Sequence, residues 1–226
     1  MKKRYPTNLP GAPRLTLEQV SDGMKACHEN AKRLIDDAQS LLARGSHATA
    51  WFLAIIAQEE LAKIQLISMQ GLPFSDREKA RAWWVFTHHE EKLAVREAAA
   101  VAIPAGKYSD AEHDAITKTA ARHHQAKLDA LYVGRLRDGR WPRPAESIKV
   151  GDAPKLVAYV QEQVRRQPIS SPEQLAFLGR FMNEYGLTGI LDPQVAMERL
   201  RELLPEEAAE IVIKQLIEMA LPGAKP

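Results

Sequence analysis

Apolar residues recur with helical spacing along most of the chain, and signals for helix ends separate the periodic segments. Thr16 and Gln19 have the spacing of a capping box, and Gly45 follows the last apolar positions of that segment, so a first helix is predicted between them. A second helix is predicted from Ser46 to about Gly71. No segment alternates apolar and polar residues as a half-buried strand does, so the pattern predicts an all-α protein.

Two further long helices are predicted by the same signals. Capping-box spacings that begin at Ser75 and Ser109 open helices over about 76–102 and 110–133, and Pro104 ends the first of them. Four long helices with short connections favour antiparallel neighbours. The expected architecture is therefore an antiparallel up-and-down helical bundle.

The last third of the chain is predicted to hold shorter helices separated by proline. After a loop rich in Gly, Arg and Pro, helical signals resume at about 153–166, 172–185 and 193–203, and from Pro205. We expect a flexible leader, a helical bundle and a C-terminal helical appendage, at residues 1–15, 16–167 and 168–226. The appendage could pack on the bundle or stand free.

Composition narrows the function classes only a little. The 31 Lys and Arg residues nearly balance the 29 Asp and Glu residues, so any attraction to nucleic acid must come from a local patch. Cys27 is the single cysteine, which excludes an intramolecular disulfide and a multi-cysteine zinc site and fits a reducing cytoplasm. The basic N-terminus lacks an apolar run, and no stretch of about 18 apolar residues exists, so we expect no secretory signal and no membrane contact.

Polar residues interrupt the apolar stripes of the second and third helices. On the second helix Glu60 lies on a stripe with Ala50, Leu53, Ala57, Ile64 and Ile67. On the third, His89 lies on a stripe with Ala82, Val85, Phe86 and Leu93. A buried carboxylate is costly unless it is paired, so we predict a contact between Glu60 and His89. Glu59 and Lys63 are spaced i, i+4, which predicts a surface ion pair.

Metal-dependent and nucleophilic chemistry find little support. Glu and His from facing helices build metal sites in bundles, but no Glu-x-x-His occurs on the second or third helix. His123 and His124 are adjacent, point about 100° apart on a helix, and are poorly placed to chelate one ion. No Gly-x-Ser-x-Gly elbow or phosphate-binding glycine loop occurs. We therefore expect no metal and no other cofactor.

Three sequence blocks resemble the AbiV family of abortive-infection proteins. They are "AWFLAIIAQEELAKI" in the second helix, "FTHHEEKL" in the third and "LYVGRLRDGRWPRP" after the fourth. In that order they cover about residues 30–145, and the family histidine and lysine fall on His89 and Lys92. The resemblance implies a bacterial defence protein against phage. It also implies a helical core similar to HEPN domains, which are often homodimers and include metal-independent ribonucleases.

The HEPN ribonuclease motif is an Arg followed, after four to six residues, by a His. Arg81 and His88 fit it with six residues between them, and on a continuous helix they would share a face about 10.5 Å apart. Metal-free RNA cleavage needs proton-transfer groups and a cation for the phosphate. The expected catalytic set is therefore His89, His88, Arg81, Glu60, Lys63 and Lys92.

The loop after the fourth helix is a candidate RNA-binding segment. Its cationic and aromatic residues suit phosphate contact and base stacking, and they are Arg135, Arg137, Arg140, Trp141 and Tyr132. The alternative is a solvated loop in which Trp141 packs down and Tyr132 is the last core aromatic of its helix. If the protein acts on RNA, tRNA or mRNA is the expected target, with a phage protein as activator.

A non-catalytic interaction module is the competing class. In that case Glu60, Lys63, His89 and Lys92 form a buried polar network that fixes the helix register. Defence would then act by binding a phage protein or the translation machinery. Solvent access to His88 and His89 distinguishes the two classes: a sealed network favours the module, and an open cationic groove favours the nuclease.

Overall fold

Helices make up most of the computed structural model, and no strand occurs among the residues it describes. The described residues are 9–89, 91–94, 110–133, 141, 143–187 and 193–205. Within these residues every helix is too short or too polar to span a lipid bilayer. The all-α class predicted from the sequence is confirmed.

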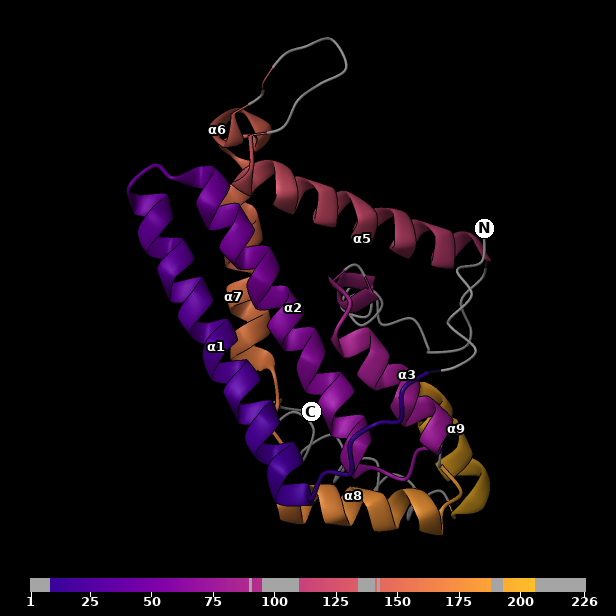
Figure 1. Ribbon diagram of the computed structural model, residues 1–226. Coiled ribbons are helices and arrows are strands. Elements are labelled where there is room, and N and C mark those ends of the chain that lie inside the picture. Colours follow the sequence, from indigo (N-terminus) through magenta and orange to yellow (C-terminus); the bar gives the residue numbers. More distant parts are fainter. Residues whose placement is uncertain are drawn as a thin grey trace.

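Three helices run side by side through the centre of the molecule. α1 (Leu17–Ala43) and α2 (His47–Gly71) form an antiparallel hairpin, and α7 (Asp152–Arg166) packs against both of them (Figure 1). Thr16 caps α1 with the reciprocal hydrogen bonds of a capping box to Gln19, as its spacing predicted. The long first two helices therefore lie where the sequence placed them.

α2 is the central helix of the fold. Besides α1 and α7, it contacts α3 (Asp76–Phe86), α5 (Asp110–Leu131) and the C-terminal helix α8 (Pro172–Glu184). Ile55, Leu61 and Ile64, spread around its circumference, are all almost completely buried. A helix enclosed in this way is apolar all round, which accounts for the composition of this segment.

The third predicted helix, about 76–102, is wrong in its extent. α3 ends at Phe86, and Thr87 is its C-cap residue. The Thr87 hydroxyl donates to the Trp84 carbonyl oxygen at 2.8 Å, and the His88 Nδ1–H donates to the same oxygen at 2.6 Å. Such local side-chain bonds compete with helix continuation. A new helical turn follows, in which the Lys92 N–H donates to the His88 carbonyl, and residues 95–109 lie outside the described part.

α5 packs against α2 and ends beside the short helix α6 (Pro144–Ser147). In Figure 1, α5 crosses α2 near one end of the hairpin and extends away from it, whereas α3 follows the other half of α2. A small second core of Ala48, Ala130, Ile148 and Ala153 joins α2, α5 and the start of α7. α3 and α5 thus cover different parts of the same helix.

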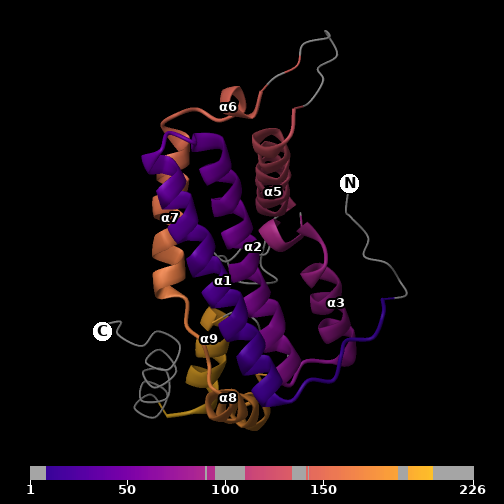
Figure 2. The same cartoon turned by 60° about the vertical axis from the view of Figure 1, so that its left-hand side comes forward.

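The C-terminal helices begin against the bundle. α8 (Pro172–Glu184) lies across one end of α1 and α2 (Figure 2), and its Leu175 belongs to the main core. The Ser21 hydroxyl of α1 donates to the Ser170 carbonyl at 3.0 Å. Beyond α8, a separate small core that includes Phe181 and Leu200 joins it to α9 (Pro193–Leu203). The helix predicted from Pro205 lies outside the described residues.

The packing of Leu175 makes a prediction about stability. Leu175 is 1% exposed, so Leu175→Ala should lower the free energy of unfolding by about 2–5 kcal/mol, the range for a buried leucine. The matched change Phe177→Leu, at a position on α8 that is 38% exposed, should cost no more than about 0.5 kcal/mol. Urea unfolding of the whole chain measures both. If Leu175→Ala shifts only a minor separate transition and leaves the bundle unchanged, α8 is not part of the core.

Candidate active site

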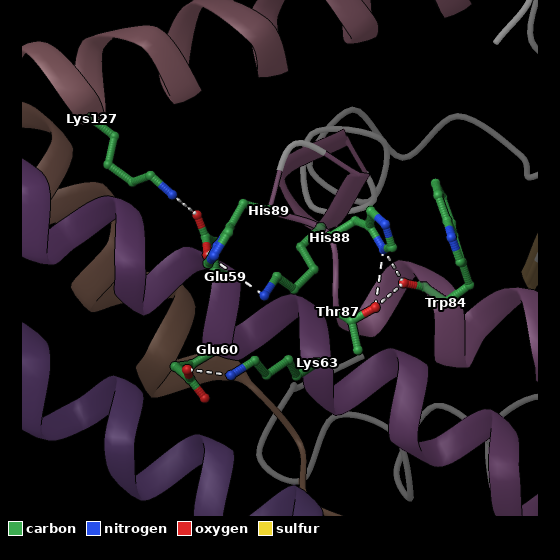
Figure 3. A network of polar contacts seen from close by, with 9 residues as sticks. Glu59, Glu60, Lys63, Trp84, Thr87, His88, His89 and Lys127 are labelled. Atoms are coloured by element: carbon green, nitrogen blue, oxygen red, sulfur yellow. Dashed lines mark hydrogen bonds and ion pairs between the residues drawn. The ribbon is translucent and has the colours of Figure 1, made fainter. Parts of the chain in front are cut away.

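A single buried carboxylate joins three parts of the chain. Glu59 of α2 is 2% exposed, and its Oε2 accepts a hydrogen bond from His89 Nδ1 at 2.5 Å. Its Oε1 accepts from Lys127 Nζ of α5 at 2.6 Å. Figure 3 shows Lys127 and His89 reaching the carboxylate from different elements. Glu59 therefore connects α2, α5 and the turn that follows α3.

A second buried lysine lies near the same carboxylate. Lys92 Nζ is 3.7 Å from Glu59 Oε2, and Lys92 and Lys127 are both 4% exposed. Burial lowers the pKa of Lys92 below its ordinary value, and the negative charge of Glu59 opposes that change. Two lysine side chains thus face one carboxylate in the interior.

His89 combines a buried anchor with an exposed ring. Its side chain is 57% exposed, although Nδ1 is bound to a carboxylate that is 3% exposed. In the neutral ring Nδ1 then carries the proton, which leaves Nε2 as the proton acceptor. A carboxylate at Nδ1 fixes the orientation of the ring and stabilises the positive charge that the ring gains on protonation. The arrangement suits general acid–base chemistry.

His88 and Arg81 are placed differently from the sequence expectation. His88 is exposed and stacks on Trp84, with 3.8 Å between ring centroids, and Figure 3 shows it on the far side of the turn from Glu59. Arg81 is exposed on α3. Because the helix ends at Phe86, the prediction that Arg81 and His88 share a face of one continuous helix is wrong.

The predicted contact between Glu60 and His89 is also wrong. Glu60 accepts a hydrogen bond from Lys63 Nζ at 2.6 Å, and it is Glu59 that binds His89. The predicted surface ion pair of Glu59 and Lys63 is wrong as well, because Lys63 binds Glu60. Glu59 is the more deeply buried of the two acids. The prediction assigned one face of α2 to the core and assumed that the third helix continues through His89. α2 is buried on several sides and that helix breaks, so neither assumption holds.

Sequence reasoning missed Lys127 as well as the role of Glu59. The signal for Lys127 was present, because it interrupts a stripe of α5 with Ala120, His123 and Ala130, the same irregularity that drew attention to Glu60. His124 was considered only as a metal ligand. Its ring lies 6.5 Å from that of His89, measured between centroids.

Cys27 of α1 lies near the Glu60–Lys63 pair and is not a nucleophile. Burial, with a smaller contribution from the negative charge of Glu60, raises the pKa of its thiol from 9.0 to about 11. The thiolate is the reactive form of cysteine, so Cys27 stays an inert core residue near neutral pH.

The described aromatic residues of the candidate RNA-binding segment are exposed. Tyr132 is 61% exposed and Trp141 is 63% exposed, so neither packs into the core. The arginines of this segment, Arg135, Arg137 and Arg140, lie outside the described residues. Over the described parts of the chain, no group of three or more acidic, histidine or cysteine side chains is placed to hold a metal ion.

Together these features define an all-α helical protein with a histidine–carboxylate pair at the edge of its bundle. The sequence matches the AbiV family, HEPN_AbiV, over residues 19–165, and the chain belongs to this family. The matched span begins in α1, ends in the last turn of α7 and contains Glu59, His89 and Lys127. Neither the curated proteins nor the solved structures gave a match. Family membership indicates a HEPN-type protein of abortive infection.

The two neighbouring acids should differ sharply in their effect on stability. Glu59→Gln leaves Lys92 and Lys127 buried without a compensating anion, and should lower the free energy of unfolding by about 3–5 kcal/mol. In Glu60→Gln the amide oxygen still accepts a hydrogen bond from Lys63, which is 21% exposed. The free energy of unfolding should therefore fall by only about 1 kcal/mol. Urea unfolding at neutral pH compares the two. Equal losses would show that Glu59 is not the charge on which the cluster depends.

The raised pKa of Cys27 predicts slow labelling by an aromatic disulfide reagent. Two units above 9.0 leave about 100-fold less thiolate at pH 8, so the folded protein should react at least about 100-fold more slowly than the urea-unfolded protein. Because the folded pKa is raised, the rate should keep rising about tenfold per pH unit beyond pH 9. A folded-state rate that levels off near pH 9 would contradict the shift.

Proposed function

We propose that this protein is a bacterial anti-phage abortive-infection protein that acts as a metal-independent endoribonuclease and blocks translation. The observation that carries the proposal is His89, an exposed imidazole whose Nδ1 is bound to the buried carboxylate of Glu59. Metal-free RNA cleavage begins when a base takes the proton of a 2′-hydroxyl. Nε2 of His89 is suited to that step, because Glu59 stabilises the imidazolium that results.

The surrounding charge favours a phosphate substrate. Lys92 and Lys127 place two positive charges below His89 against the single negative charge of Glu59. Lys92 is buried, so in this proposal it acts through its field and not by touching RNA. Arg81, exposed on α3, is the cation that this proposal assigns to phosphate contact.

Exposed aromatic residues support RNA as the substrate class. Tyr132 directly follows α5, the helix that carries Lys127, and Trp141 precedes α6. Aromatic side chains with free faces stack on unpaired bases largely irrespective of sequence. We infer tRNA or mRNA as the target and a phage protein as the activator. A homodimer is inferred as the working form because the family resemblance implies it, and the cytoplasm is inferred because Cys27 is the single cysteine.

A non-catalytic role is the second candidate, and the burial of the cluster favours it. Glu59, Lys92 and Lys127 hold three segments together, which is what a structural network requires. On this alternative His89 only completes the network, and the surface binds a phage protein or the translation machinery. The exposure of the His89 ring is the reason for preferring the nuclease.

Incubation with total bacterial RNA and with tRNA in EDTA tests the proposal. The wild type should cleave, and His89→Ala should lower the rate by about 10²–10⁴-fold, the usual contribution of a proton-transfer group. His88→Ala should lose far less, since His88 is bonded to the Trp84 carbonyl and stacked on its ring. Circular dichroism establishes that both variants are folded.

The same three proteins should be expressed in cells and followed after phage infection, which covers activation by a phage component. RNA breakdown in cells with the wild type but not in cells with His89→Ala is the expected result. Intact RNA in all samples, purified and cellular, would contradict the nuclease and favour the interaction module.

A further inference from the structure

A second histidine, His124 of α5, lies beside His89. The ring centroids are 6.5 Å apart and the ring planes differ by 24°. His124 is half-buried, whereas His89 is exposed, so the pair lies at the boundary between the protein interior and solvent. The two rings come from different segments, so the contacts between those segments determine the distance between the rings.

One carboxylate fixes both histidines. Lys127 is three residues after His124, so the two lie on neighbouring positions of one face of α5. Glu59 binds Lys127 at 2.6 Å through one oxygen and His89 at 2.5 Å through the other. The Lys127–Glu59 contact is buried on both sides and sets the position of α5 relative to the His89 turn. His124 is thereby held next to His89 by the same anchor that orients His89.

The adjacent histidine on α5 faces a different neighbour. His123 makes an edge-on contact with Trp51 of α2, with 6.2 Å between ring centroids and 81° between planes. Successive residues of a helix diverge by about 100°, so only one of the two can face His89. The geometry selects His124.

The separation suits two groups that act on one phosphodiester. At 6.5 Å between centroids the rings are too far apart for a direct hydrogen bond. Cleavage by the 2′-hydroxyl needs a base at the attacking oxygen and an acid at the leaving oxygen of the same phosphate, each within about 2.6–3.2 Å. Two imidazoles a phosphate's width apart can meet that requirement from a single chain.

We propose that His124 is the general acid of the ribonuclease, an inference that rests on the proposed function. The 2′-oxygen bonds to phosphorus while its proton passes to Nε2 of His89, and the bond from phosphorus to the 5′-oxygen breaks. The imidazolium of His124 gives its proton to that 5′-oxygen. The products are a 2′,3′-cyclic phosphate and a 5′-hydroxyl, and no co-reactant is needed. His89 is assigned as the base because Glu59 stabilises the charge that a base acquires.

A substrate with sulfur in place of the leaving 5′-oxygen tests the assignment. A thiolate leaves without protonation, so the loss of a general acid matters only for the oxygen substrate. With a short RNA, His124→Ala should be slower than wild type by about 10²–10⁴-fold. With the matching 5′-phosphorothiolate RNA it should come within about tenfold of wild type, whereas His89→Ala stays impaired on both substrates.

Matched variants separate a chemical role from a structural one. His123→Ala changes the neighbouring histidine that contacts Trp51, and should keep rates within about threefold of wild type on both substrates. His124→Gln keeps a polar side chain of similar size and should show the same substrate-dependent loss as His124→Ala. Recovery on the sulfur substrate itself shows that the variant is folded.

The outcomes also separate this inference from the proposed function. Wild type that cleaves neither substrate, together with intact RNA in infected cells, overturns both. Wild-type cleavage that is lost in His89→Ala but retained in His124→Ala on the oxygen substrate overturns the inference alone. An equal loss on both substrates in the His124 variants also overturns it, because His124 would then act on structure or on binding.

Discussion

The charge of Glu59 in the interior is the constraint around which this side of the molecule is organised. A buried carboxylate is tolerated only when its oxygens are fully engaged by donors. Here the donors are His89 and Lys127, and neither belongs to the helix that carries the acid. The pairing therefore links the central helix to two peripheral segments, α5 and the segment that follows α3.

Two acids that are adjacent in sequence serve two different interfaces. Glu59 faces the side of α2 covered by α5 and the His89 turn, whereas Glu60 pairs with Lys63 and lies near Cys27 of α1. The divergence of about 100° between neighbouring helical residues makes this division possible. An enclosed helix can carry two charges in succession, provided that each meets its own partner.

The parts of the fold that the sequence predicted are those set by local chemistry. The beginnings of α1 and α3 follow from capping boxes, and that of α8 follows from the proline at its first position. The end of α3 was missed because it depends on two weak side-chain bonds to the Trp84 carbonyl, which no apolar period reveals.

The site was half predictable for a related reason. His89 was found because it broke a pattern, and its partner was missed because α2 has no exposed face from which to decide between Glu59 and Glu60. On an amphipathic helix, the position of each acid relative to the apolar face would have shown which of the two is buried. Lys127 broke a pattern too, on α5, but a lysine among alanines is an ambiguous signal until the facing carboxylate is known.

The break after α3 and the burial of Glu59 are complementary. His89 lies at the beginning of the helical segment that restarts after the break at Thr87. Its ring is bound at Nδ1 by a carboxylate on the central helix, and that carboxylate is almost completely buried. The buried lysines contact that carboxylate from the interior, while the ring itself remains open to solvent. A single side chain, Glu59, therefore connects the enclosed helix α2 to a solvent-exposed imidazole at its edge.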